Sequence, residues 1–287
     1  MLEHRFPDSR PPQRVVILGA GGFVGGAILA RLRAEGIAAE PVSHAALDLT
    51  AEDAATALRG LLRAGDSLAF VSARAPARTP ALLTLNVRMA ETVCAAVAGA
   101  GLDHLLYISS DAVYADDAAL VSERIPAAPG SPHGVMHLAR ELMLKSAGVP
   151  MAILRPSLLY GSRDPHNGYG PNRFLRQAGA GQSITLFGEG EEQRDHVAVE
   201  DLAELALRAL KHGSVGVLNV ATGRSASFRE VAERAAAGRV PVSGSPRQSP
   251  VTHRHFDVTA RLAAFPDLAM IPLAEGMERM RLALAKA

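Results

Sequence analysis

Short runs of apolar residues alternate along the chain with longer stretches in which apolar positions recur at helical spacing. The apolar runs predict buried strands at residues 14–18, 38–42, 67–73, 104–110 and 151–157. Helical spacing predicts a helix directly after the first strand and further helices at residues 51–64, 80–99 and 132–147. Strands that alternate with helices of this length are typical of a parallel, doubly wound sheet, so the predicted fold class is α/β with a Rossmann-type core.

Composition and charge exclude several classes of protein. The net charge is +1 and arginine is interspersed with Glu and Asp, so no basic stripe suited to nucleic acid is present. No apolar run reaches the roughly 18 residues that cross a bilayer. The single cysteine, Cys94, excludes an internal disulfide and a cysteine-based zinc site. Residues 1–13 are polar, rich in proline and lack a signal-peptide core, which predicts a disordered lead-in to a cytoplasmic protein.

A glycine motif follows the first predicted strand. Gly19, Gly22 and Gly25 are spaced G-x-x-G-x-x-G and lead directly into a predicted helix. A turn without side chains allows backbone N–H groups to approach a pyrophosphate, and the N-terminus of the helix adds partial positive charge. The alternative is a tight turn without a ligand, but the strand and helix on either side favour a dinucleotide site.

With these motifs the chain resembles the extended short-chain dehydrogenase/reductase family, which includes nucleotide-sugar epimerases, dehydratases and reductases. The resemblance runs from Arg14 to about Leu282 and includes "LDLT", "FVSA", "YISSDAVYA", "RPSLLYG" and "LNVATG". It implies a nicotinamide dinucleotide cofactor. The cofactor-binding positions that it implies are Gly19, Gly22, Phe23, Val24, Gly25, Asp48, Leu49, Ala73 and Pro156, with Asn86 opening a long helix.

The resemblance also implies a division into two parts. Residues 14–165 and 195–222 would form the dinucleotide-binding domain, and residues 166–194 and 223–287 the smaller substrate-binding part. A nucleotide sugar is the implied substrate. Ser110 would bind its reacting oxygen, while Asp111, Asn172 and Arg194 are the candidate substrate contacts, the last two facing the diphosphate.

One motif departs from the family pattern. The family carries a Tyr-x-x-x-Lys pair in a segment such as "SPYGxSKxxxE", whereas this chain reads "SPHGVMHLARE". His133 therefore stands at the tyrosine, His137 at the lysine and Glu141 at the usual glutamate. A phenol has a pKa near 10 and needs a neighbouring cation to act near neutrality, whereas imidazole titrates near 6.5 without one. The two replacements are chemically consistent with each other.

Three interpretations of this departure remain open. His133 is the proton donor and acceptor, with Ser110 orienting the sugar oxygen and His137 on the cofactor ribose. Alternatively, the protein binds nucleotide and sugar without catalysis, as a regulatory subunit. In the third, a different group such as Asp111 or Tyr160 carries the proton. A zinc site at His133 and His137 lacks a third ligand and an H-E-x-x-H pattern, so no metal is predicted.

The second strand bears on the choice of cofactor. The place of the acidic residue that binds both ribose hydroxyls of NAD is taken by Ser43, which does not repel a 2′-phosphate. NADP is therefore favoured over NAD, although no arginine follows Ser43 directly. By analogy with relatives, a homodimer is expected to form through residues 80–99 and 132–147.

Overall fold

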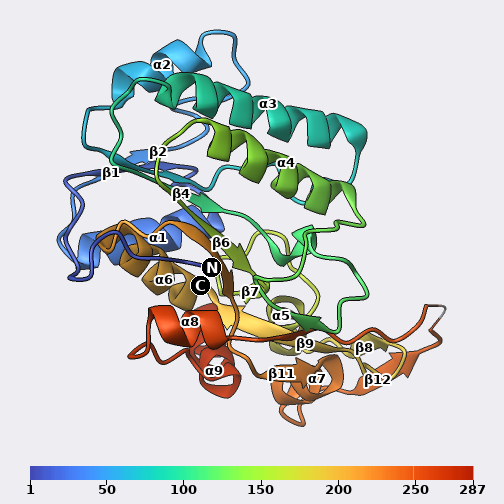
Figure 1. Ribbon diagram of the computed structural model, residues 1–287. Helices are drawn as coiled ribbons and strands as arrows, with labels where there is room; N and C mark the ends of the chain where they lie inside the picture. The colour runs from blue at the N-terminus through green and yellow to red at the C-terminus, as the bar shows by residue number, and fades with distance from the viewer. Residues whose placement is uncertain (248, 287) are drawn as a thin grey trace.

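A six-stranded parallel sheet with the order β10-β6-β4-β3-β1-β2 forms the centre of the computed structural model, which describes residues 1–247 and 249–286 (Figure 1). This confirms the predicted doubly wound α/β fold. The strands of this sheet are β1 (Val15–Leu18), β2 (Ala39–Val42), β3 (Ser67–Phe70), β4 (His104–Ile108), β6 (Met151–Pro156) and β10 (Gly216–Val220).

Helices cover both faces of this sheet (Figure 1). They are α1 (Phe23–Ala34) and α6 (Val199–Lys211) on one face, and α2 (Ala54–Leu61), α3 (Pro80–Val97) and α4 (Pro132–Ser146) on the other. Successive side chains of a strand point to opposite faces. Val15 and Ile17 accordingly pack beneath α1 and α6, whereas Val16 and Leu18 pack beneath α2, α3 and α4.

A smaller part is built at the carboxyl end of the sheet. Its elements are β7 (Leu158–Tyr160), α5 (Pro171–Gly179), β8 (Ile184–Phe187), β9 (Gln193–Ala198), β11 (Ser225–Ser227), α7 (Phe228–Ala236), β12 (Val242–Ser245) and α9 (Leu273–Leu284). The remaining elements are η1 (Asp111–Val113), β5 (Leu120–Val121), β13 (His255–Phe256) and α8 (Thr259–Ala264). Phe174 of α5, Val231 of α7 and Met277 of α9 share one hydrophobic core, so segments distant in sequence form this part together.

The predicted strands at residues 67–73 and 104–110 end earlier than expected, at Phe70 and Ile108. Beyond Phe70 the chain leaves the sheet, and Asn86 of α3 holds it through both backbone groups of Arg74. The Oδ1 of Asn86 accepts from the N–H of Arg74, and its Nδ2 donates to the carbonyl of Arg74. The residues that leave the sheet here form the loops at its carboxyl edge, where ligands bind in this class of fold.

The N-terminal segment has an ordered path, contrary to the expected disordered lead-in. Glu3 pairs with Val215 through two backbone hydrogen bonds of 2.8 and 2.7 Å. The ring of His4 is hydrogen-bonded to Ser214 Oγ at 2.8 Å and to the carbonyl of Ala264 at 2.9 Å. The partners of Glu3 and His4 lie more than 200 residues away, so local composition carried no sign of them. None of the described helices is both long and apolar enough to cross a membrane.

Candidate active site

The turn between β1 and α1 has the form of a phosphate-binding cradle. Gly19 has φ +93°, and a Cβ atom there would lie 2.9 Å from the backbone N of Ser72. A Cβ at Gly25 would lie only 2.1 Å from the carbonyl oxygen of Gly19. Gly22 is the N-cap residue of α1, and no side chain caps the first N–H groups of this helix. The turn can be this tight because Gly19 and Gly25 have no side chains, and this geometry fits the pyrophosphate of a dinucleotide. Phe23 and Val24 are the next residues, in the first turn of α1.

Ser43, Asp48 and Leu49 follow the second strand at the same edge of the sheet. The Cβ of Ser43 lies 3.8 Å from the Cβ position of Gly21, which places it beside the glycine turn. The Asp48 carboxylate accepts from Thr50 N–H at 2.9 Å and from Thr50 Oγ1 at 2.7 Å, and these bonds lower the pKa of Asp48. Leu49 is buried. The predicted adenine and ribose positions therefore lie along one rim.

Arg74 is a cation at this rim that the sequence alone did not reveal. It comes from the loop after β3, and its Nη2 lies 3.5 Å from Nε2 of His44, the residue after Ser43. The absence of an arginine directly after Ser43 weakened the prediction of an NADP site. The structure brings the positive charge from a second loop instead, one residue beyond the predicted cofactor position Ala73.

Ser110 and Asp111 begin the turn that follows β4. Ser110 caps η1, because its Oγ accepts from the N–H of Ala112 at 3.1 Å. The Asp111 carboxylate forms an ion pair of 3.1 Å with Arg254, and burial raises the pKa of Asp111. A carboxylate held by an arginine is poorly placed to serve as a mobile proton carrier, so this pair favours a structural role for Asp111.

His133 lies in the first turn of α4, which packs closely against η1. Ser131 caps the helix by accepting from Gly134 N–H at 3.2 Å, and Pro132 occupies the first helical position. A Cβ at Gly134 would lie 2.0 Å from the carbonyl oxygen of Ala112, so only glycine permits this approach. The close contact brings His133 toward the turn that begins at Ser110.

His133 and His137 form one polar cluster with Tyr107 of β4. The two imidazole rings meet edge to face with centroids 4.7 Å apart. Nδ1 of His137 is hydrogen-bonded to the hydroxyl of Tyr107 at 2.8 Å. Burial lowers the pKa of the half-buried His133 and places that of His137 well below the usual 6.5, while it raises the pKa of Tyr107 to about 12. All three side chains are therefore uncharged at neutral pH.

Glu141, one turn beyond His137, fixes α4 to the sheet. Its carboxylate accepts from Nε and Nη2 of Arg155 at 2.9 and 2.6 Å, and from Ser109 Oγ at 2.6 Å. All three side chains are buried. Arg155 leads into Pro156, the predicted cofactor contact at the end of β6. This network sets the position of the helix that carries both histidines.

Arg194 and Asn172 have different surroundings. The guanidinium of Arg194 bonds the carbonyl oxygens of Gln193 and Thr252 at 2.9 and 2.5 Å, and among the described residues it forms no ion pair. Within the described part of the chain no carboxylate lies within ion-pair distance of Arg194, although Glu192 and Asp111 act on its charge from farther away. Asn172 instead binds backbone: its Oδ1 accepts from Gly161 N–H at 2.9 Å. Its place in the structure favours a structural role over a diphosphate contact.

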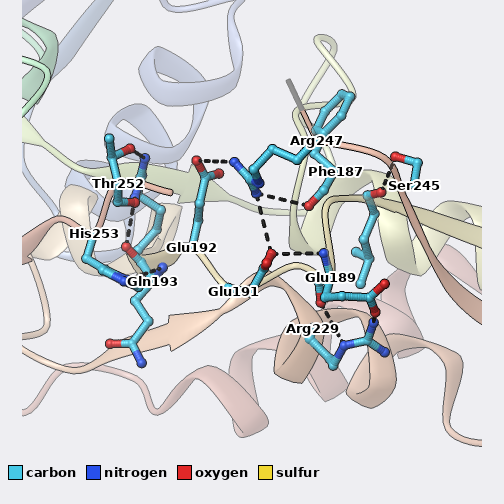
Figure 2. A network of polar contacts seen from close by, with 12 residues as sticks. Phe187, Glu189, Glu191, Glu192, Gln193, Arg229, Ser245, Arg247, Thr252 and His253 are labelled. Atoms are coloured by element: carbon cyan, nitrogen blue, oxygen red, sulfur yellow. Dashed lines mark hydrogen bonds and ion pairs between the residues drawn. The ribbon is translucent and has the colours of Figure 1, made fainter. Parts of the chain in front are cut away.

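Glu191 and Glu192, which could have paired with Arg194, are engaged by Arg247 instead. Nη1 of Arg247 lies 3.0 Å from Glu192, and Nη2 lies 3.7 Å from Glu191 (Figure 2). Nη2 also donates to the carbonyl of Phe187 at 3.0 Å. Arg247 lies in a segment that reads as an ordinary surface loop, so its role depends on a contact over some 55 residues that no local pattern indicates.

Tyr160 is poorly suited to the role of an alternative proton carrier. It belongs to the core of the smaller part and is 2% exposed. Its hydroxyl packs against Gly276 of α9, so closely that a Cβ there would lie 1.8 Å away. Burial raises the pKa of Tyr160 far above neutrality. Within residues 1–247 and 249–286, no group of three or more His, Cys, Asp or Glu side chains could hold a metal ion.

Comparison with known proteins places this site in a class. The model of the NAD dependent epimerase/dehydratase family matches residues 15–221. A UDP-glucose 4-epimerase of Mycolicibacterium smegmatis is 28% identical over 93% of this chain and 96% of its own length. The low-salt glycan biosynthesis protein Agl12 of Haloferax volcanii is 27% identical over 53% of this chain, and the match spans only 51% of that relative.

A solved structure agrees over the whole fold. The UDP-glucose 4-epimerase of Thermus thermophilus, in complex with NAD, has a TM-score of 0.82, is 23% identical, and the match covers 96% of this chain and 99% of that one. The chain belongs to the NAD dependent epimerase/dehydratase family.

Proposed function

We propose that this protein is an NAD(P)-dependent epimerase- or reductase-type enzyme that acts on a nucleotide sugar, with His133 as the proton donor and acceptor. One observation carries the proposal: His133 lies where the loops after β3 and β4 meet. The N–H of Ala77 contacts its ring, and Gly134 packs its helix turn on η1. Relatives named as epimerases do not favour the alternative of a non-catalytic binding protein.

The residues divide the work as follows. When bound, the nicotinamide accepts or returns a hydride at the sugar carbon. Ser110 is positioned to donate a hydrogen bond to the reacting sugar oxygen. His133 removes the proton from the hydroxyl as the hydride leaves and returns it when the hydride comes back. Since its pKa lies below the usual 6.5, the ring is a free base at neutral pH.

The ring nitrogens of His133 have distinct tasks. Ala77 N–H donates to Nδ1 at 3.4 Å, a long and therefore weak bond. For Nε2 to accept a proton from the sugar, the neutral ring must carry its own proton on Nδ1. The contact with Ala77 must then open, so we propose that ligand binding shifts the loop that carries this residue.

His137 and Arg194 bind the ligands in this account. We propose that the Tyr107 hydroxyl donates a hydrogen bond to Nδ1 of His137, which places the single ring proton on Nε2, as a donor for the cofactor ribose. The guanidinium of Arg194, which forms no ion pair among the described residues, suits a diphosphate, which accepts two parallel hydrogen bonds. The guanidinium of Arg74, which lies against His44 next to Ser43, supports NADP as the cofactor.

The decisive experiment is turnover of UDP-glucose as the first probe, with NAD⁺ or NADP⁺ present. Product sugars are separated by chromatography, and cofactor reduction is followed by fluorescence. The His133→Ala variant should lose about 10²- to 10⁴-fold in kcat, the usual contribution of general acid–base catalysis. Lys145→Ala, an exposed position at the far end of α4, is the matched control and should retain activity. Unchanged turnover in His133→Ala would remove this residue from the mechanism.

A further inference from the structure

Arg140 is a fully buried arginine on α4 to which no role has yet been given. Its side chain is 0% exposed, and within the described part of the chain it pairs with no carboxylate. Nη2 donates to the carbonyl of Ser72 at 2.6 Å, Nη1 lies 3.7 Å from the sulfur of Met136, and Nε has no partner among the described residues. A buried cation without a counter-charge opposes folding, so this position points to a function.

The helix places this cation behind the two histidines. Positions 133, 137 and 140 are spaced by four and three residues, so they lie on one face of α4. The guanidinium lies over the ring of Phe70, with Cζ 4.1 Å from its centroid, and 5.3 Å from the centroid of Tyr107. Tyr107 is hydrogen-bonded to His137, so only buried aromatic side chains separate the charge from the pair.

On its other side Arg140 binds the loop that packs against the glycine turn. The carbonyl that it binds belongs to Ser72, whose backbone N is 2.9 Å from the Cβ position of Gly19. A single side chain therefore links the helix of the histidines to the glycine turn.

Other charges near the pair are few. Glu141 lies on the same helix but is neutralised by Arg155. Tyr107 of β4 is the hydrogen-bond partner of His137. The titratable and charged groups that act on the two imidazoles or on Tyr107 are His166 from the loop after β7, and Arg140 and Glu141 from α4. Arg140 is the permanent cation in this set.

We propose that Arg140 is the fixed positive charge behind the two histidines, which adds to the effect of their burial in opposing protonation of His133 and His137, and that it holds the Ser72 loop against the glycine turn. Arg140 is thus a positioning residue. The proposal rests on the proposed proton role of His133 and extends it, because the charge comes from position 140 instead of position 137, where the resemblance places lysine.

The test is a titration of the histidine side chains by NMR in the cofactor-free protein. Arg140→Gln and Arg140→Met remove the charge, and Gln keeps a donor for the Ser72 carbonyl, whereas Arg140→Lys keeps the charge. The pKa of His133 should rise in both neutral variants, while burial still holds it below the usual value near 6.5, and it should stay close to wild type in Arg140→Lys. The acidic limb of the pH profile of kcat/KM should move in the same direction.

An unchanged pKa of His133 in Arg140→Gln and Arg140→Met would overturn the inference. A buried unpaired charge costs free energy, so its removal in Arg140→Met is not expected to prevent folding. If Arg140→Met fails to fold while Arg140→Lys folds, the residue is structural and the inference also fails. The titration needs neither cofactor nor sugar, so an inactive wild-type protein would end the proposed function while the role of Arg140 is still decided separately.

Discussion

Arg74 is the side chain on which the proposed preference for NADP over NAD depends. It lies beside His44, the residue after Ser43, and we propose that this rim binds the 2′-phosphate of NADP. NAD lacks this phosphate, so the same cation contributes little to its binding.

Arg74→Ala should therefore weaken NADPH and leave NADH almost unchanged. A charge-assisted hydrogen bond contributes about 1.5–3 kcal/mol, which corresponds to roughly 10- to 100-fold in affinity. Fluorescence titration of both reduced cofactors measures the two dissociation constants. Arg88→Ala, which changes an exposed arginine on α3, is the control. Equal losses for NADPH and NADH would refute the assignment of the 2′-phosphate to Arg74.

The candidate residues differ in how well they could be recognised from the sequence. His133 and His137 were found because Ser131, Pro132 and Glu141 fix the alignment of their helix. Arg74 was missed because a loop delivers its charge to a strand end some 30 residues away in sequence. Asn172 matched a motif position, yet its amide is engaged by the backbone of Gly161, a detail that no motif records.

At the scale of elements, the glycine turn and α1 depend on contacts that exclude any side chain. Gly25 faces the carbonyl of Gly19 with no room for a methyl group, whereas Gly26, its neighbour, has its nearest atom 3.5 Å from the Cβ position. These adjacent glycines of one helix form a matched pair for mutation.

Gly25→Ala should force the turn open, abolish detectable cofactor binding and cost about 1–3 kcal/mol of unfolding free energy, as overpacking usually does. Gly26→Ala should be tolerated, since alanine in a helix interior is favoured over glycine by about 0.5–1 kcal/mol. Chemical denaturation and NAD(P)H binding measure both effects. Equal behaviour of the two variants would show that the tight contact at Gly25 does not shape the turn.

The order of the helices in the dinucleotide-binding half, and the extent of the longer ones, were predictable because their apolar spacing repeats over several turns. The helix predicted at 51–64 is shorter than expected, since α2 covers only Ala54–Leu61. The predicted helix at 80–99 and the predicted helix at 132–147 agree with α3 and α4 to within two residues. Strand ends were less predictable. Side chains from other elements, such as Asn86 at the end of β3, decide where a strand leaves the sheet.

At the scale of the whole molecule, buried uncharged histidines make stability depend on pH. Burial lowers the pKa of His104 and His137, and that of His196 to about 4. In the unfolded chain these rings bind protons near pH 6.5. Because the unfolded state binds more protons below this value, the contribution to stability is complete above pH 6.5 and is lost as the pH falls toward 4.

The free energy of unfolding should therefore drop between about pH 6.5 and 4.5, as measured by urea denaturation. The lowered pKa of His196 alone should account for a loss on the order of 3 kcal/mol as the pH falls from 6.5 to about 4, since one pKa unit corresponds to about 1.4 kcal/mol. His196→Phe, beside the ring of Phe228, should flatten the pH dependence. The exposed His44→Phe should not. A wild-type protein equally stable at both pH values would contradict this account.

Long-range organisation was the least predictable feature. The packing of residues 3–10 depends on partners near the end of α6 and beyond, which local composition does not reveal. The homodimer through α3 and α4 and the cytoplasmic location stay predictions. Leu142 of α4 is 59% exposed and Val135 is 41% exposed, which leaves an apolar strip available on that helix.

The interleaving of the smaller part has a practical consequence for anyone exchanging sugar preference between relatives. Its core joins α5 to α7 and α9, while β9, α6 and β10 lie between these segments along the chain. No single continuous segment of the chain carries this core. A chimera that exchanges only the segment before α6, or only the segment after β10, would pack foreign core residues against native ones, so both segments have to be transferred together.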